Sequence, residues 1–212
     1  MTRMAVLRSA VLLLVVALFG GCAEEALETV LTDSDPSLLA HRPTGSPPAN
    51  AATLALAAPD YAGLDGATAQ GTPGSLHLTV DAAGEIPRHP DAFIQSVAVF
   101  GYAWADLETG KAIVAVIHPV IGRDSQQNPD GWHTHPVQLS DGTTASSFCI
   151  VSIGRSQGGI GISDGVLQTN VALQWADLNA SVLDVAAAFI VQLDPECAAT
   201  GLGVAVLGAA AL

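Results

Sequence analysis

The residues best suited to chemistry are two histidines, His133 and His135, which one residue separates within the segment 131–136. On a β-strand, side chains two residues apart point to the same face, and their Cα atoms lie about 6–7 Å apart. Two imidazoles at that spacing can bind one metal ion, and imidazole is a good ligand for zinc and copper. The pair therefore suggests a copper or zinc site.

A third ligand would come from the residues just before this segment. A catalytic zinc site has three protein ligands and one open position. His118, at the end of the preceding predicted strand, is the first candidate, and Asp124 and Asp130 in the intervening loop are the next. Two other interpretations stay open: surface histidines on an edge strand, and histidines with a structural, hydrogen-bonded role.

Other patterns that carry chemistry are weaker. The glycine-rich segment 154–159 lacks the Gly-Lys-Ser/Thr ending of a phosphate-binding loop. Ser146 and Ser147 have no nucleophile-elbow context, and the acidic residues are scattered singly rather than paired as in glycosidases. The polar loop 124–130 has oxygen donors for calcium or a sugar, although an ordinary solvated loop also accounts for it. We therefore expect a domain without catalytic activity.

The first residues predict export. Arg3 and Arg8 precede an unbroken apolar run over residues 10–19. A membrane-spanning helix needs about 20 such residues, so this run is too short to span a bilayer, but its length suits the middle of a secretory signal. Gly20 and Gly21 then supply the small residues that a signal peptidase accepts. We predict that residues 1–21 are a signal peptide.

The segment 18–22, Leu-Phe-Gly-Gly-Cys, resembles the lipobox of bacterial lipoproteins and departs from it at Phe19, where that family usually has Leu, Val or Ile. The resemblance implies cleavage before Cys22 and fatty acyl chains such as palmitate on that residue. Two or more chains anchor a protein durably, because each buried CH₂ contributes about 0.8 kcal/mol. Ala23 is not the aspartate linked to inner-membrane retention, which implies the outer membrane where the cell has one. Simple secretion with a free Cys22 is the alternative.

Charge limits the partners of the mature chain. Removing residues 1–21 also removes Arg3 and Arg8, which leaves five basic residues against 20 acidic ones and a net charge of −15. Such a surface repels nucleic acid and anionic lipid headgroups. Apart from the membrane that holds the anchor, the expected partners are a cation, a small-molecule ligand or another envelope protein. The acidity also keeps an exported protein soluble.

The cysteine count agrees with export. If Cys22 carries lipid, Cys149 and Cys197 remain as a pair, and such pairs usually oxidise outside the cytoplasm. Closing a loop of about 48 residues would stabilise the fold by roughly 4 kcal/mol in the chain-entropy model. The alternative is a pair of buried free thiols.

Proline-rich composition predicts a flexible tether over residues 22–74. The change to β-favouring segments that follows predicts a folded domain over residues 75–212. That domain contains about eight short β-favouring runs, at 76–80, 93–104, 112–118, 132–139, 148–153, 166–175, 187–193 and 202–207. A polar turn at 107–111 predicts a hairpin. The fold class is therefore all-β, an antiparallel β-sandwich that is immunoglobulin-like or similar. A capping box at 181–184 offers a helix at 182–192 as an alternative to the strand.

The segment 131–135, Gly-Trp-His-Thr-His, is similar to the Gly-aromatic-His-x-His segment of copper/zinc superoxide dismutases, which are exported β-sandwich proteins with one intrachain disulfide. That family completes its metal sites with histidines further downstream, and this chain has none after His135. We therefore do not expect dismutase activity. The leading functional prediction is a lipid-anchored cell-envelope protein with a non-catalytic binding or structural domain. The alternative is a copper- or zinc-binding envelope protein that uses His133, His135 and His118.

Overall fold

The computed structural model describes residues 58–97, 99–118, 131–156 and 159–212, all of which belong to the compact unit Ser37–Leu212. The predicted signal peptide, Cys22 and most of the predicted tether lie outside these residues, as do Asp124 and Asp130. Among the described residues, no helix is both long enough and apolar enough to cross a bilayer.

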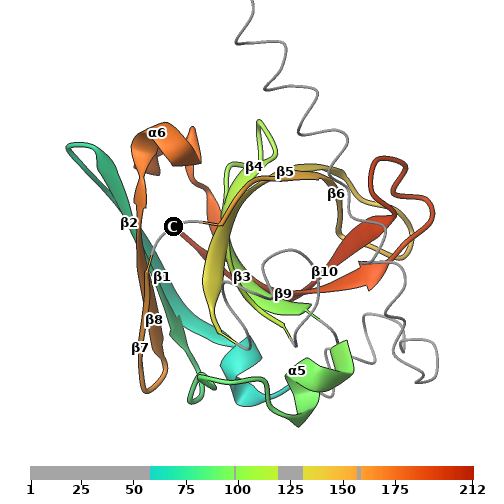
Figure 1. Ribbon diagram of the computed structural model, residues 1–212, viewed down its shortest axis with the longest axis horizontal. Helices are drawn as coiled ribbons and strands as arrows, with labels where there is room; N and C mark the ends of the chain where they lie inside the picture. Colours follow the sequence, from blue (N-terminus) through green and yellow to red (C-terminus); the bar gives the residue numbers. More distant parts are fainter. Residues whose placement is uncertain (1–57, 98, 119–130, 157–158) are drawn as a thin grey trace, which may run out of the picture. The chain divides into compact units, whose positions relative to one another are not determined.

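Two antiparallel sheets make up the described fold (Figure 1). The four-stranded sheet has the spatial order β1-β2-β8-β7, and its strands are β1 (Leu64–Thr72), β2 (Ser75–Ala82), β8 (Val166–Ala172) and β7 (Ile160–Ser163). All three neighbouring pairs in this sheet run antiparallel. Two short helices, α5 (Ala92–Val97) and α6 (Leu173–Ala176), and a 3₁₀ turn, Ala180–Val182, lie in connections between strands, and a second 3₁₀ turn, Asp60–Ala62, precedes β1.

The second sheet closes on itself, and we call it the closed sheet. Its order is β10-β6-β5-β4-β3-β9, with strands β10 (Leu202–Ala211), β6 (Phe148–Ile153), β5 (His133–Asp141), β4 (Lys111–Ile117), β3 (Val99–Ala105) and β9 (Val185–Leu193). In Figure 1 it is seen nearly end-on, as a ring of ribbons. Closure depends on a short contact in which Gly203 pairs with Cys149 and Val204 with Phe148. The all-β antiparallel prediction is confirmed, and the closure of one sheet is a feature that the sequence did not indicate.

Strand alternation sorts the apolar residues into two clusters. On β2, the alternate residues Leu76, Leu78 and Val80 are fully buried against the outer face of the closed sheet. Trp104 on β3 belongs to the same cluster, and its Nε1–H donates a hydrogen bond of 3.1 Å to the carbonyl oxygen of Thr79 across the two sheets.

The second, smaller cluster lies on the opposite face of β3, β4 and β9, which is the inner face of the closed sheet. Its buried members are Val114, Val116, Ile150, Phe189 and Val204. Along β4 these residues alternate with the buried residues of the first cluster, so β4 carries apolar side chains on both faces. This explains why its sequence is a continuous apolar run rather than an alternating one.

The predicted domain boundary at residue 75 is wrong, because β1 lies in the segment that we assigned to the tether. Its outward positions are polar or glycine, so its sequence has little apolar content. Pairing with β2 over its whole length compensates for this, and the hydroxyls of Thr68 and Thr79 lie 2.7 Å apart across the two strands. Just before β1, Tyr61 is buried and its ring packs edge-on against Phe100 at 5.2 Å.

Two other element predictions need correction. The strand expected at 93–104 begins only at Val99, because α5 covers Ala92–Val97. Asp91 caps that helix, since its Oδ1 accepts a hydrogen bond of 2.9 Å from the backbone N–H of Ile94. The glycine-rich segment after β6 contains the edge strand β7 instead of being only a loop. The strand prediction at 187–193 is confirmed, because β9 lies between β3 and β10 and no helix forms there.

Candidate metal centre: a histidine cluster inside the closed sheet

The pairing of β4 with β5 brings the predicted histidines together. His118 directly follows β4, and His133 begins β5. In the register of this antiparallel pair, Val116 lies opposite His133 and Val114 lies opposite His135. Residues directly opposite in an antiparallel pair point to the same face. His133 and His135 therefore both point to the inner face of the closed sheet, with Val116 and Val114. This confirms the prediction that the two histidines share a face.

The shortest approach is between His118 and His133, from neighbouring strands, rather than within the His-x-His segment. Their Nε2 atoms are 3.2 Å apart, and their ring centroids are 4.8 Å apart at an interplanar angle of 88°. The ring centroids of His133 and His135 are 5.0 Å apart, at an interplanar angle of 79°. The three residues are only 9%, 2% and 7% exposed, so the interpretation as surface histidines is wrong.

Backbone carbonyls orient two of the rings. The Nδ1 atom of His133 lies 2.9 Å from the carbonyl oxygen of Gly131, and that of His135 lies 2.7 Å from the carbonyl oxygen of Gly154. A carbonyl oxygen can only accept, so each Nδ1 must carry the proton. In the neutral ring the lone pair is then on Nε2. This is the arrangement in which backbone carbonyls orient histidines that bind metal through Nε2.

The distance between the two Nε2 atoms matches that between two ligands of one ion. Zinc binds histidine nitrogen at about 2.0–2.1 Å in tetrahedral geometry, which places two such nitrogens about 3.3 Å apart. The observed separation is 3.2 Å. Among the described residues, no group of three or more His, Cys, Asp or Glu side chains is arranged to hold an ion together. Within the described residues, the two facing nitrogen donors belong to His118 and His133, and His135 lies beside them.

Apolar residues surround the pair on the inner face. Gly101 lies opposite Val116 on one side and Phe189 on the other, in the same row as His133. A Cβ atom at Gly101 would lie 2.8 Å from Val116 Cγ1 and 3.0 Å from Phe189 Cζ. Gly101 therefore lets these two side chains approach each other next to the histidines. Glycine here is a packing requirement, which the sequence alone did not indicate.

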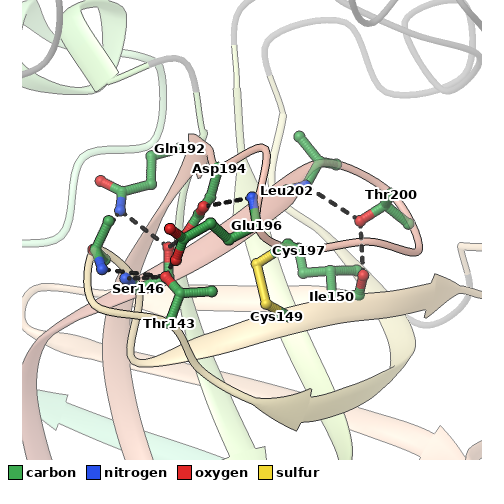
Figure 2. Close-up of a disulfide and its surroundings, with 11 residues drawn as sticks. Thr143, Ser146, Cys149, Ile150, Gln192, Asp194, Glu196, Cys197, Thr200 and Leu202 are labelled. Atoms are coloured by element: carbon green, nitrogen blue, oxygen red, sulfur yellow. Dashed lines mark hydrogen bonds between the residues drawn. A yellow bond between two sulfur atoms is a disulfide. The ribbon is translucent and has the colours of Figure 1, made fainter.

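A second polar cluster surrounds the disulfide (Figure 2). Cys149 and Cys197 are joined, as predicted, with their Cα atoms 5.2 Å apart. Next to them Asp194, only 2% exposed, accepts hydrogen bonds from Ser146 Oγ at 2.6 Å and from Thr143 Oγ1 at 2.5 Å. These bonds, with Ser146 first, hold the pKa of Asp194 below its ordinary value.

The role of this second cluster is structural. Asp194 Oδ1 also accepts a hydrogen bond of 3.0 Å from the N–H of Glu196, and the N–H of Cys197 donates to the carbonyl of Asp194 at 3.0 Å. Asp194 thus accepts hydrogen bonds both within its own turn and from the turn before β6, and these bonds hold the two turns together. Sequence reasoning did not find this residue. The signal it missed was the Asp-Pro-Glu-Cys turn next to a paired cysteine.

No family model, curated protein or solved structure matches this chain.

Proposed function

We propose that this chain is an exported protein, anchored to the cell envelope by a lipid on Cys22, whose β domain binds a zinc or copper ion through His118 and His133 without catalysing a reaction. One observation carries the metal part of this proposal. Two buried imidazoles point Nε2 at Nε2 across 3.2 Å, and a backbone carbonyl orients the ring of His133 through Nδ1.

Binding would replace a hydrogen bond by metal coordination. Without an ion, the proton on Nδ1 of His133 leaves its Nε2 as an acceptor, so Nε2–H of His118 must be the donor across the 3.2 Å contact. With an ion, both Nε2 lone pairs face the metal and the proton of neutral His118 moves to Nδ1. Among the described residues, these two nitrogens face each other across the contact, and His135 lies beside them.

Two features support the export part of the proposal. A disulfide such as Cys149–Cys197 persists in oxidising compartments and is rare in the cytosol. The mature chain also has a net charge of −15, which concentrates cations near its surface.

The metal proposal is tested on the exported chain carrying Cys22→Ser, which provides it in soluble form. After chelation and dialysis, zinc and copper are added separately, and bound metal is measured by elemental analysis and calorimetry. We expect about one ion per chain, and an affinity at least about tenfold lower in His118→Ala and in His133→Ala.

His77→Ala is the matched control. His77 lies on the outer face of the four-stranded sheet, where its Nδ1 contacts Asn170 Oδ1 at 2.9 Å, so its loss should leave metal binding unchanged. Each variant is checked for folding by circular dichroism. Equal binding by the wild-type chain and a folded His118→Ala/His133→Ala double variant would refute the site.

The anchor is tested by fractionating cells that express the wild-type chain or Cys22→Ser. We expect the wild-type protein with the membranes and the variant in the soluble fraction. A variant that still sediments with the membranes would rule out the lipid on Cys22.

A further inference from the structure

We infer that the Cys149–Cys197 disulfide is a redox-sensitive latch on the closed sheet. When a dithiol reduces it, the sheet opens between β6 and β10, while its other strand pairs stay together. We call this junction the seam; there Gly203 pairs with Cys149 and Val204 pairs with Phe148. The inference depends neither on the histidine site nor on the lipid anchor.

The seam is the shortest junction of the closed sheet. Its register covers the two residue pairs just named, and the N–H of Ser147 adds a backbone hydrogen bond of 2.7 Å to the carbonyl oxygen of Val204. Each of the other junctions extends along most of a strand. A sheet opens most readily where the fewest paired groups must separate, so the seam is the place where the closed sheet can open.

β6 is the strand that moves, because apolar packing fixes β10 better. Ala205 and Leu207 of β10 pack in the large apolar cluster on the outer face of the closed sheet. Within the described residues, that cluster includes no residue of β6. β6 contributes Ile150 and Phe148 to the small inner cluster instead. Packing therefore holds β10 on both faces of the closed sheet and holds β6 on the inner face alone.

The disulfide crosses the seam and keeps it closed. Cys149 lies on β6, and Cys197 lies in the turn that joins β9 to β10. The covalent bond keeps the two sides of the seam at a high effective concentration, so hydrogen bonds that break there re-form at once. After reduction, bonds such as that from Thr200 Oγ1 to the carbonyl oxygen of Ile150 at 2.6 Å remain. Water can replace each of these bonds, so they stabilise closure only modestly.

Reduction begins when the turn over residues 194–201 moves, because Cys149 and Cys197 are only 7% and 1% exposed. A thiolate of the dithiol attacks one sulfur of the bond and expels the other as a thiolate. The second thiol of the reagent then displaces the mixed disulfide. Two electrons and two protons end on the sulfurs of Cys149 and Cys197, and the dithiol leaves as a cyclic disulfide.

Opening of the seam changes the surface of the molecule. Phe148 and Ile150 on β6 move away from Val204 on β10, which exposes part of the inner apolar cluster to solvent. The redox state of the two cysteines thus controls whether the inside of the closed sheet is accessible through the seam.

Hydrogen exchange measured by mass spectrometry tests the inference. The soluble Cys22→Ser chain is compared before and after treatment with dithiothreitol, which continues until both thiols titrate. Peptides that cover residues 146–153 should exchange faster after reduction. This acceleration should be at least about tenfold greater than that in peptides that cover residues 99–105 of β3. The apolar dye anilinonaphthalene sulfonate should also bind the reduced chain more strongly.

Cys149→Ser/Cys197→Ser in the same background is the control, because it should show the fast pattern with or without dithiothreitol. Unchanged exchange over residues 146–153 of the fully reduced chain would overturn the inference, since the seam would then stay closed without the bond. An equal acceleration in residues 146–153 and in β3, or loss of the circular dichroism signal on reduction, would also overturn it. Either result would mean that the whole domain, rather than the seam, depends on the disulfide.

Discussion

Ser146 Oγ donates a hydrogen bond of 2.6 Å to Asp194 Oδ2, which joins the turn before β6 to the turn after β9 (Figure 2). Gln192 Nε2 donates to the same hydroxyl at 3.1 Å, and Thr143 donates to the same carboxylate oxygen at 2.5 Å. The disulfide joins the same two regions of the chain. Closure of the sheet between β10 and β6 occurs next to this network, at Gly203 and Cys149.

The network predicts an acid-sensitive contribution to stability. Hydrogen bonds from Ser146 and then Thr143 hold the pKa of Asp194 below its unfolded value near 3.8. A lowered carboxyl pKa stabilises the folded state fully above the unfolded pKa, and this contribution disappears as the pH falls through the folded pKa. Asp194→Asn should therefore be less stable than wild type at pH 7. The difference in the free energy of unfolding should shrink below about pH 4.

Urea denaturation of both chains at pH 7 and at pH 3 measures this difference. Asp81→Asn, on the exposed outer face of β2, is the control and should change stability little at either pH. If Asp194→Asn loses the same free energy of unfolding at pH 7 and at pH 3, the negative charge of Asp194 does not contribute to the stability of this network.

The disulfide should stabilise the fold substantially. Replacing both cysteines in Cys149→Ser/Cys197→Ser opens a loop with a sequence separation of 48. We expect a loss of about 2–4 kcal/mol in the free energy of unfolding, most of it through the unfolded chain. Equilibrium urea unfolding measures it, and adding reductant should destabilise the wild-type chain but not the double variant. Two titratable thiols in the unfolded, unreduced Cys22→Ser chain would contradict the bond itself.

Local patterns in the sequence predicted most of the strands but not their assembly. Alternation predicted that His133 and His135 share a face, because that follows from strand geometry alone. It could not predict that this face is the inside of a closed sheet, since closure depends on the pairing of Gly203 with Cys149, far apart in the chain. For the same reason the histidines were weighed as surface residues, although packing buries them.

The missed strands show a second limit. β1 carries few apolar side chains, and its membership in the sheet depends on β2 rather than on its own propensity. β7 is a four-residue edge strand within a glycine-rich segment, where local signals favour a loop. The disulfide was predicted correctly because it needed only a count of cysteines and a compartment.

The hydroxyl of Thr134, which lies between the two histidines, should lower the free energy of unfolding. Its Oγ1 is buried and has no hydrogen-bond partner in the described part of the chain. An unsatisfied buried polar group typically costs about 1–3 kcal/mol, so Thr134→Val should stabilise the fold by roughly 1 kcal/mol. Thr169→Val is the matched control, because the buried Thr169 hydroxyl donates to the carbonyl of Gly159 at 3.0 Å and its removal should destabilise. Thermal or urea unfolding of both variants measures these changes in stability. Destabilisation by Thr134→Val would contradict the expectation.

The protonation pattern of the histidine cluster gives the most direct test of the site's geometry. The carbonyls of Gly131 and Gly154 require a proton on Nδ1 of His133 and of His135, so both rings should be Nδ1–H tautomers at neutral pH. His118 should be the Nε2–H tautomer, because it donates to His133 across 3.2 Å. Long-range proton–nitrogen NMR spectra of the imidazole rings distinguish the two forms. Added zinc should convert His118 to the Nδ1–H form and leave the tautomer of His133 unchanged, while the partly exposed ring of His77 serves as the internal reference. An Nε2–H tautomer at His133 before zinc is added would mean that its lone pair does not face His118, and the two-nitrogen site would lose its basis.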